Sequence, residues 1–548
     1  MKNFEHRFIF IGLLLIVMTV SPTVSFEPIT QPKFLILTCL ASIALLRIFK
    51  IRNLINLKNN RTYVFSLLFY IFLLCSVFIF SQQPRTKQLF GVEGRGLGLI
   101  TYLSLTIIFI FVSLSTTFGL ISITLKAIQV IGVISAVIGI FQMIGLNIFT
   151  GSDLNYGLVV GLLGNPNFQS ALLGMSFIVY LRNILHSKGQ QKSLLFQATL
   201  ILIALYGSNS MQGYFIAIIG ILIFLFYIFY EKNYLKTLYI LLTTTLLSLI
   251  YTIFGLLGKG FLSPYFYQAS NIYRGDYWRA AGRMIIENPV LGLGFDSYRD
   301  NYRLFRDTYA TNRRGPDAIT DSPHNFLLEA GVNGGVSLMI FNLVLIFVLV
   351  VTFLINFKKI KTHKLDLVCL FSLWLAFIAQ ATISPGNIAI LMLGWTLSGL
   401  ILGLKINLKN LESSTTYQNK FKLKNYRIII SGILIGIFIA GPNFYSDARF
   451  MSALKSKELK KIVSSAYMWP RDEFRMARVI KSLNENGFYT EALDLARVAT
   501  KNFPKTFEIW REFYQIPTLT LEEKKIILST MREIDPNNIN LSRALNKS

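Results

Sequence analysis

The sequence has few charged residues and is especially poor in acidic ones. Only 15% of its 548 residues are charged, with 28 acidic residues against 54 lysines and arginines. An average soluble protein has roughly 25% charged residues, so an ordinary soluble enzyme is excluded. A disordered chain is also excluded, because 53% of the residues are hydrophobic and 14% are aromatic. The composition indicates a protein whose main solvent is lipid.

Cysteine and the motifs of familiar soluble enzymes are scarce as well. The three cysteines, Cys39, Cys75 and Cys369, lie in apolar runs and are too few for a disulfide framework. Their spacing does not suit a metal site, and we interpret them as small buried hydrophobic residues. The sequence contains no phosphate-binding Walker loop, no zinc-binding spacing and no convincing serine triad.

What the sequence does have is long apolar runs. A bilayer core about 30 Å thick requires about 20 apolar residues per helix, because each backbone polar group must be paired within the segment. We therefore expect an all-α, polytopic membrane protein with about 13 transmembrane helices. The first run lacks a convincing cleavage site and is expected to be retained. The predicted runs lie near residues 8–24, 33–49, 62–80, 99–118, 126–146, 168–183, 193–207, 212–230, 234–256, 326–356, 365–383, 387–404 and 427–442.

The distribution of lysine and arginine predicts the orientation of these helices. With a cytoplasmic N-terminus, 23 of the 54 basic residues fall in inward segments, as the positive-inside rule requires. The short outward segments 147–167, 208–211 and 384–386 contain none. The net charge of +26 is therefore mostly a topology signal, and no nucleic-acid partner is expected. The inward segments are 1–7, 47–61, 119–126, 182–192, 231–236, 357–364 and 405–427.

Two outward segments do not follow this rule. Segment 81–98 contains Arg85, Lys87 and Arg95, and the long extracytoplasmic loop 257–325 contains nine basic and seven acidic residues. Positive charge on the side that topology disfavours requires another explanation. We therefore expect the chemistry of the protein in and around this loop.

The composition changes after residue 442, where the chain becomes polar and helix-forming. We therefore expect a transmembrane domain over 1–442 and a helical tail over 443–548 on the extracytoplasmic side. Pro470, Pro504 and Pro536 follow one another at intervals of 34 and 32 residues. This spacing favours a tetratricopeptide-like tail over an unspecialised helical one. Whether the run 427–442 spans the membrane decides on which side the tail lies.

The segment 321–331 leads from the long loop back into the membrane. Pro323 can begin a helix, which places His324 and Asn325 in its first turn. Free N–H groups and the helix dipole favour anions there, and the dipole favours a neutral imidazole that can accept a proton. A histidine that only makes local hydrogen bonds is the alternative. The arginines in the same loop favour a functional role.

The arginines of the long loop suit a diphosphate ligand. Read as a helix up to Pro289, the segment that contains Arg274 places Arg279 and Arg283 one turn apart. The guanidinium fork stays charged and binds phosphate oxygens in pairs. The alternative is a solvated interfacial helix with internal pairs such as Asp276 with Arg279. Three further arginines with neighbouring aspartates are expected to be mainly structural: Arg299, Arg303 and Arg306, beside Asp296, Asp300 and Asp307.

These segments together resemble the O-antigen ligase and polymerase superfamily, which also contains bacterial protein O-oligosaccharyltransferases. The resemblance covers roughly residues 1–405, and the tail resembles the tetratricopeptide extensions of some members. It rests on five segments: Gly91 to Gly98 around Arg95, Gly164-Asn165-Pro166-Asn167-Phe168, Arg274 four residues before Trp278, Asn288-Pro289-Val-Leu-Gly292-Leu-Gly294, and Ser322-Pro323-His324-Asn325.

One departure from the family pattern lies before the eighth predicted span. Many members have a Ser-Arg pair there, whereas this chain has Ser208-Asn209-Ser210-Met211-Gln212-Gly213. Arg95, which lies at the membrane edge on the same side as His324, or Arg279 is expected to take over the role of the missing arginine.

The resemblance implies a metal-independent glycosyltransferase, without a cofactor, in the bacterial cytoplasmic (inner) membrane and with its active site on the outer face. Its donor is a glycan linked to undecaprenyl diphosphate, and its acceptor is a hydroxyl of lipid A-core, of a growing polymer or of a protein. We expect His324, the only histidine on the outer face, to act as the base and Arg274 to stabilise the departing diphosphate. The predicted substrate-binding residues are Arg95, Arg279, Arg283 and Asn325.

Three other functions compete with transfer to a lipid or protein. A polysaccharide polymerase uses the same donor, and the sequence does not separate it from a ligase. A transporter of lipid-linked oligosaccharides should have its ionisable residues near mid-bilayer, whereas here they gather in an outer loop. A scaffold whose tail recruits a protein partner leaves His324 and the loop arginines unexplained.

Overall fold

The structure is a computed structural model that describes residues 4–51, 61–146, 159–186, 189, 191–407 and 423–545. Within these residues it contains helices and no strand, as expected for an all-α protein. Parts of five predicted segments lie outside the described residues: 1–3, 52–60, 187–188 with 190, and 408–422 of the inward segments, and 147–158 of the outward segment 147–167.

A helix lies at each of the predicted apolar runs. Ten of these helices are long and apolar enough to cross a membrane, and we conclude that the protein is a multi-span membrane protein. The other three, α1, α5 and α8, are shorter, so the count of thirteen spans stays a prediction. The helices are α1 Phe4–Met18, α2 Thr30–Ile51, α3 Arg61–Phe80, α5 Leu99–Ser115, α6 Phe118–Met143, α7 Pro166–His186, α8 Gln191–Gly207, α9 Met211–Glu231, α10 Leu235–Leu256, α15 Phe326–Lys359, α16 Lys364–Ala381, α17 Ile388–Ile406 and α18 Leu423–Ser456.

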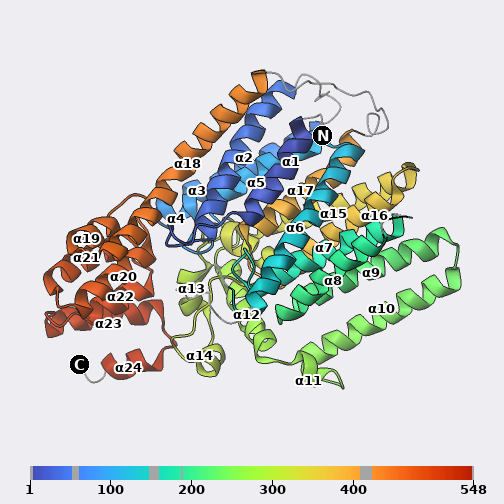
Figure 1. Ribbon diagram of the computed structural model, residues 1–548. Helices are drawn as coiled ribbons and strands as arrows, with labels where there is room; N and C mark the ends of the chain where they lie inside the picture. Colours follow the sequence, from blue (N-terminus) through green and yellow to red (C-terminus); the bar gives the residue numbers. More distant parts are fainter. Residues whose placement is uncertain are drawn as a thin grey trace.

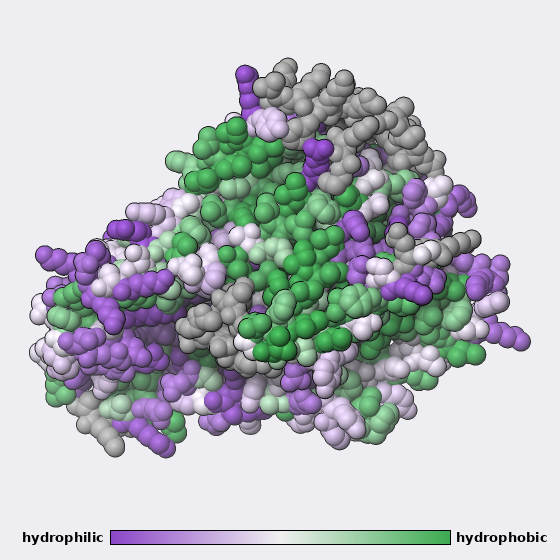
Figure 2. All heavy atoms as spheres, viewed as in Figure 1, coloured by the Kyte–Doolittle hydropathy of each residue, from purple (hydrophilic) through white to green (hydrophobic). Residues whose placement is uncertain are grey.

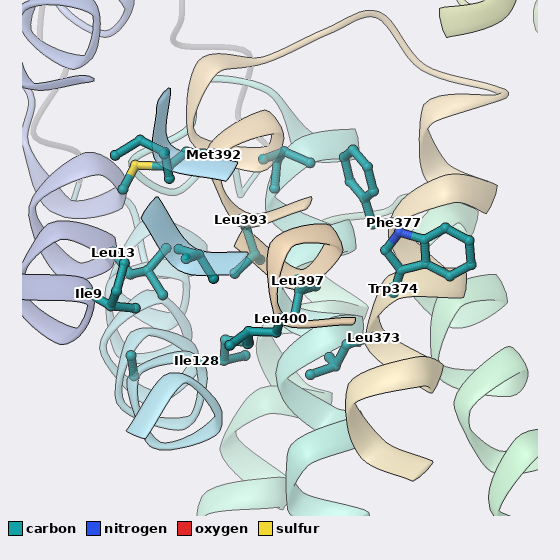
Figure 3. Packing of buried hydrophobic residues seen from close by; sticks show 14 of the residues in the cluster. Ile9, Leu13, Ile128, Leu373, Trp374, Phe377, Met392, Leu393, Leu397 and Leu400 are labelled. Carbon is teal, nitrogen blue, oxygen red and sulfur yellow. The ribbon is translucent and has the colours of Figure 1, made fainter. Parts of the chain in front are cut away.

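Helix α17 lies at the centre of the bundle. Leu393, Leu397 and Leu400 of this helix lie between α1 and α16, where Leu13 and Trp374 belong to the same cluster (Figure 3). Of the residues in its apolar stretch, 78% are buried, compared with 6% in α10. Helix α10 lies at the edge of the bundle (Figure 1), and its apolar side chains are available to lipid.

Helix α15 is broken by a pair of glycines, and the long loop pairs with it at the break. Gly334 and Gly335 have non-helical backbone angles, which leave neighbouring polar groups unpaired. The N–H of Val336 donates to the carbonyl of Pro289 (2.7 Å), and the N–H of Leu293 donates to that of Val332 (2.7 Å). The two backbones lie so close that a Cβ on Gly335 would meet the Pro289 carbonyl oxygen at 2.5 Å. This contact fixes the end of α12 against α15.

The long loop forms four helices at one end of the bundle; α13 and α14 lie beside the tail, and α11 lies at the end of α10 (Figure 1). A short helix, α4 (Arg85–Phe90), precedes α5 at the other irregular outward segment. The helices of the loop are α11 Ser263–Phe266, α12 Ala269–Glu287, α13 Tyr298–Phe305 and α14 Thr308–Arg314.

The tail has a hydrophobic core of its own, separate from that of the bundle. Helix α18 continues past the predicted boundary at 442 to Ser456, with Pro442 inside it, and Phe450 is part of the core of the tail. Polar side chains cover the tail, whereas apolar ones dominate the middle of the bundle (Figure 2). The tetratricopeptide-like character stays a prediction. The tail helices are α19 Leu459–Ala466, α20 Glu473–Glu485, α21 Tyr489–Asn502, α22 Phe507–Tyr514, α23 Leu521–Ile534 and α24 Ile539–Leu545.

Buried ion pairs join the tail to the long loop. Arg306 and Arg303 of the loop both contact the carboxylate of Asp535, at 2.7 and 3.2 Å, and the Asp535 side chain is fully buried. The guanidinium of Arg303 also lies 4.1 Å from the ring centre of Phe507, and that of Arg299 lies 3.9 Å from the ring centre of Phe474.

The three arginines do not pair with the aspartates that lie beside them in the sequence. The neighbouring aspartates form bonds elsewhere, and the arginines contact residues more than 200 positions away in the chain. Asp300 and Arg303 are three residues apart on α13, a spacing that allows pairing, but Lys87 contacts Asp300 and Asp535 of the tail contacts Arg303 instead. The contacts of the aspartates are Asp296 with Arg95, Asp300 with Lys87, and Asp307 with Arg279 and Arg283.

Substituting Asp535→Asn removes the charge that balances two buried guanidinium groups. We expect the variant to be less stable by about 3–5 kcal/mol, because a buried charge is left uncompensated. Thermal unfolding of the purified protein in detergent measures this loss. The matched control is Glu485→Gln, which removes an exposed carboxylate 3.8 Å from Lys481 and should change stability by less than about 1 kcal/mol. Equal melting temperatures for the two variants would contradict the prediction.

Candidate functional site

The site is built where segment 81–98 and the long loop 257–325 interlock. The N–H of Phe295 donates to the side-chain oxygen of Gln88 (2.8 Å), and the amide of Gln88 donates to the carbonyl of Phe295 (3.1 Å). One residue later, Asp296 accepts the N–H of Val92 (2.8 Å). Loop 81–98 and the segment after α12 are thus held together by hydrogen bonds and form one unit, which positions the residues of the site.

Arg95 joins this unit to the segment that contains His324. Its buried guanidinium lies 3.2 Å from Asp296, pairs with Glu329 in the first turn of α15, and donates to the carbonyl of Asp321. Burial works against the charge of Arg95, but Asp296, Glu329 and Asp321 outweigh this and raise its pKa. Arg95 therefore positions the segment before α15, and its charge is balanced by carboxylates of the protein.

His324 lies just before helix α15, not in its first turn as the sequence predicted. The helix begins at Phe326, and Asn325 is its N-cap, accepting the N–H groups of Leu327 (3.0 Å) and Leu328 (3.1 Å). Asparagine is among the preferred N-cap residues, which explains why the helix begins after it rather than at Pro323. The side chain of Asn325 is thus engaged with the backbone.

The backbone of His324 is in the left-handed region, with φ at 54°, and its N–H donates to the Oγ of Ser322 (2.8 Å). This conformation is uncommon for a residue with a side chain. It turns the chain sharply between the loop and the helix. The imidazole is held at that turn, between a cavity and helix α12.

The cavity in front of His324 has a volume of about 350 Å³. Its polar wall includes the carboxyl groups of Glu27 and Asp321 and the amides of Asn165 and Asn387. Burial, together with the charge of Asp447, raises the pKa of Glu27 to about 7. Carboxyl and amide groups of this kind accept and donate hydrogen bonds to hydroxyl groups. The remaining lining residues are Pro28, Ile29, Thr30, Lys33, Gly94, Arg95, Leu163, Gly164, Phe168, Pro385, Gly386 and Ile388.

Helix α12 and α14 provide the other surroundings of His324. The ring of Tyr277 lies 5.4 Å from the imidazole, centre to centre. Arg274 lies one turn before Tyr277, and Arg314 donates to the hydroxyl of Tyr277 (2.5 Å). Neither arginine is among the residues that line the cavity. Sequence analysis did not single out Tyr277 or Arg314, because nothing in the sequence separates Arg314 from the other arginines of the loop.

The surroundings of His324 keep its imidazole neutral. Burial lowers the pKa of His324 to about 4; Asp321 acts in the opposite direction, and the positive charges of Arg274, Arg95 and Arg314 act with burial. A neutral imidazole was expected from the helix dipole, but the structure attributes it to burial and to the arginines. At neutral pH the ring can therefore accept a proton.

Arg279 and Arg283 occupy a different side of helix α12. Arg279 pairs with Asp276 (2.5 Å) and Asp307 (3.0 Å), and Arg283 lies 3.3 Å from Asp307. Arg313 contacts Asp276 at 2.8 Å. The structure thus contains the internal pairing that sequence analysis gave as the alternative, and the charges of these arginines are balanced within the loop.

Arg274 differs from them because its partner is not a carboxylate. Its guanidinium donates to the side-chain oxygen of Asn271 (2.6 Å), and burial lowers the pKa of Arg274. The side chain is half-buried, and a positive charge partly removed from water without a negative partner is stabilised when an anion binds. Within the described residues, no group of three His, Cys, Asp or Glu side chains is arranged to hold a metal ion.

Residues 196–343 match the family model described as O-antigen ligase. The matched segment runs from α8 into α15 and contains Arg274, Arg314 and His324. The match supports the superfamily expected from the sequence, a membrane family of ligases and polymerases that resemble glycosyltransferases and usually occur in the bacterial inner membrane. No curated protein matches the chain.

The imidazole of His324 should titrate far below the usual value of a histidine. Nuclear magnetic resonance of the protein with isotope-labelled histidine should show a midpoint near pH 4, because burial and the neighbouring arginines disfavour the cation. The chain has four histidines, and His324→Asn identifies the signal. Arg274→Gln removes one positive charge and should raise the midpoint. A midpoint near 6.5 in both proteins would contradict this account.

Proposed function

Because the chain contains an O-antigen ligase domain at residues 196–343, we propose that it is a metal-independent glycosyltransferase that requires no cofactor. It moves a glycan from undecaprenyl diphosphate to a hydroxyl group of a lipid A-core sugar or of a protein. The reaction takes place on the outer face of the bacterial cytoplasmic membrane. The polymerase alternative uses the same donor with a growing polysaccharide as the acceptor.

The observation that carries the proposal is the position of His324 between two different environments. On one side lies a cavity with hydroxyl-binding carboxyl and amide groups, which suits an acceptor. On the other side lies Arg274, a half-buried cation without a carboxylate partner. An incoming hydroxyl and a departing diphosphate need these two environments, on opposite sides of the reacting carbon.

In the proposed step, the acceptor hydroxyl attacks the anomeric carbon of the donor sugar. The bond between this carbon and the diphosphate oxygen breaks, and its electron pair leaves with undecaprenyl diphosphate. His324 takes the proton of the attacking hydroxyl on its neutral ring. Arg274 stabilises the negative charge that develops on the diphosphate. Arg95 positions Asp321 and, through it, the turn that holds His324.

The low pKa of His324 implies that the donor binds before the imidazole acts as a base. An imidazole with a pKa near 4 is a weak base at neutral pH, because a base works best when its pKa is close to the operating pH. Burial is the main cause of the low pKa of His324, and the positive charges of the neighbouring arginines lower the pKa further; a bound diphosphate offsets the contribution of these charges. Binding of the donor therefore raises the pKa of His324 and makes the imidazole a stronger base when the acceptor is to be deprotonated. In the free enzyme the imidazole is only weakly basic.

Substituting His324→Asn or Arg274→Gln should reduce transfer by roughly 10²-fold or more, because a general base and a charge-stabilising group are lost. Membranes and a lipid-linked glycan donor serve for the assay. Asparagine is chosen because it tolerates the left-handed backbone of His324.

His363→Asn is the matched control, since His363 also has a left-handed backbone (φ at 55°) at a helix N-terminus but lies on the ring of Phe118. It should transfer at the rate of the unchanged protein. Full activity of both site variants at normal expression would disprove the mechanism.

A single direct displacement inverts the anomeric centre of the transferred sugar. We expect the product linkage to have the opposite configuration to the donor, which nuclear magnetic resonance of the purified product measures. Retained configuration would require either a covalent intermediate or attack from the face that the diphosphate leaves. It would rule out the proposed direct displacement, while leaving the donor and acceptor classes untouched.

A further inference from the structure

Two arginines near His324 are without a carboxylate partner within the described residues: Arg274 and Arg314. All other arginines of the long loop contact an aspartate or glutamate. An arginine that is already paired with a carboxylate binds a further anion only weakly. Arg274 and Arg314 are therefore the two arginines of the loop that are available to bind an anion. The balanced arginines are Arg279, Arg283, Arg299, Arg303, Arg306 and Arg313.

Arg314 is held by aromatic rings rather than by a carboxylate. Its guanidinium carbon lies 4.8 Å from the ring centre of Tyr273 and 5.5 Å from that of Tyr277. One N–H donates to the hydroxyl of Tyr277 (2.5 Å). A guanidinium has five N–H donors, so stacking fixes the plane of the group while leaving donors for a ligand. The same Tyr277 ring contacts His324.

We propose that Arg314 and Arg274 together bind the diphosphate of the lipid-linked donor, with Arg314 as the second cation of the site. This inference rests on the function proposed above and adds a residue to it. A diphosphate has two phosphate groups, and two guanidinium forks can each bind oxygens in pairs. Arg314 thereby takes over the role of the arginine that is missing before α9. The sequence assigned this role to Arg95 or Arg279, but the charges of both are balanced by carboxylates.

The loop before α9 explains why a replacement is needed. In its sequence Ser208-Asn209-Ser210 there is no cation, and Ser210 donates to the side chain of Asn167 (2.8 Å) and accepts from Ser170 (2.9 Å). These bonds join the loop to α7. The loop therefore has a packing role, and the second positive charge comes from α14 instead.

The surface beside Arg274 suits the lipid part of the same ligand. Asn271, which accepts from Arg274, donates to the carbonyl of Phe266 at the end of α11 (2.7 Å). Phe261 and Tyr265, in and next to α11, are 69% and 72% exposed. Aromatic side chains of this kind settle at the interface between membrane and water. A polyprenyl diphosphate arriving from the membrane on this side meets Arg274 and Arg314 without passing through the acceptor cavity.

The test uses undecaprenyl diphosphate itself, which carries no glycan, and the full-length protein in lipid nanodiscs. Arg314→Gln should weaken its binding by about tenfold or more, because charge-assisted hydrogen bonds are lost. Binding of undecaprenol, which has no phosphate, should be unchanged. The matched control is Arg313→Gln, which alters the neighbouring residue of α14 and should bind undecaprenyl diphosphate as the unchanged protein does.

The outcomes separate this inference from the proposed function. Unchanged affinity of Arg314→Gln, or an equal loss in Arg313→Gln, overturns the role of Arg314, and in both cases the donor stays undecaprenyl diphosphate. If the unchanged protein binds undecaprenol and undecaprenyl diphosphate equally, the proposed donor itself is wrong. Where Arg314→Gln does not fold, Arg314→Lys keeps the charge but loses the fork, and it should still bind measurably more weakly than the unchanged protein.

Discussion

The ion pairs of Arg95 hold the candidate site together. Its single guanidinium group contacts Asp296 after α12, Glu329 in α15 and the carbonyl of Asp321. Burying a charge costs several kcal/mol, and only well-placed partners of opposite sign offset that cost. The arrangement is therefore stable only when three segments of the chain come together. This requirement sets the position of the turn at His324 relative to the membrane helices.

The tail also provides partners of opposite charge for buried arginines, in this case those in the rest of the long loop. Ordering a loop of this length costs conformational entropy. Its own hydrophobic cluster, which includes Tyr277, Met284 and Tyr298, offsets part of that cost but leaves its arginines without partners of opposite charge. The tail supplies the missing partners: Asp535 balances Arg303 and Arg306, and the ring of Phe507 stacks on Arg303. The loop is thus fixed between the bundle on one side and the tail on the other. The tail is therefore a structural support of the long loop.

Sequence patterns predicted the elements well and their contacts poorly. Apolar runs identified the helices of the bundle, because each span must pair its own backbone whatever surrounds it. The Ser-Pro-His-Asn segment identified His324, but it placed the start of α15 too early, since capping by Asn325 was decided by local hydrogen bonds. Arg299, Arg303 and Arg306 have aspartates beside them in the sequence, whereas their partners in the structure belong to the tail.

The sequence by itself determined that the chain is helical and membrane-embedded, that its basic residues mark one side, and that His324 lies in a loop rich in arginine. These properties depend on composition and on spacing along the chain, which the sequence contains in full. Only the tertiary structure decided which arginines are balanced and which are available. The pairing of a charge depends on its neighbours in space, and Arg306 meets its partner 229 residues further along the chain. Arg274 and Arg314 stand out only after every other arginine of the loop has been assigned its carboxylate.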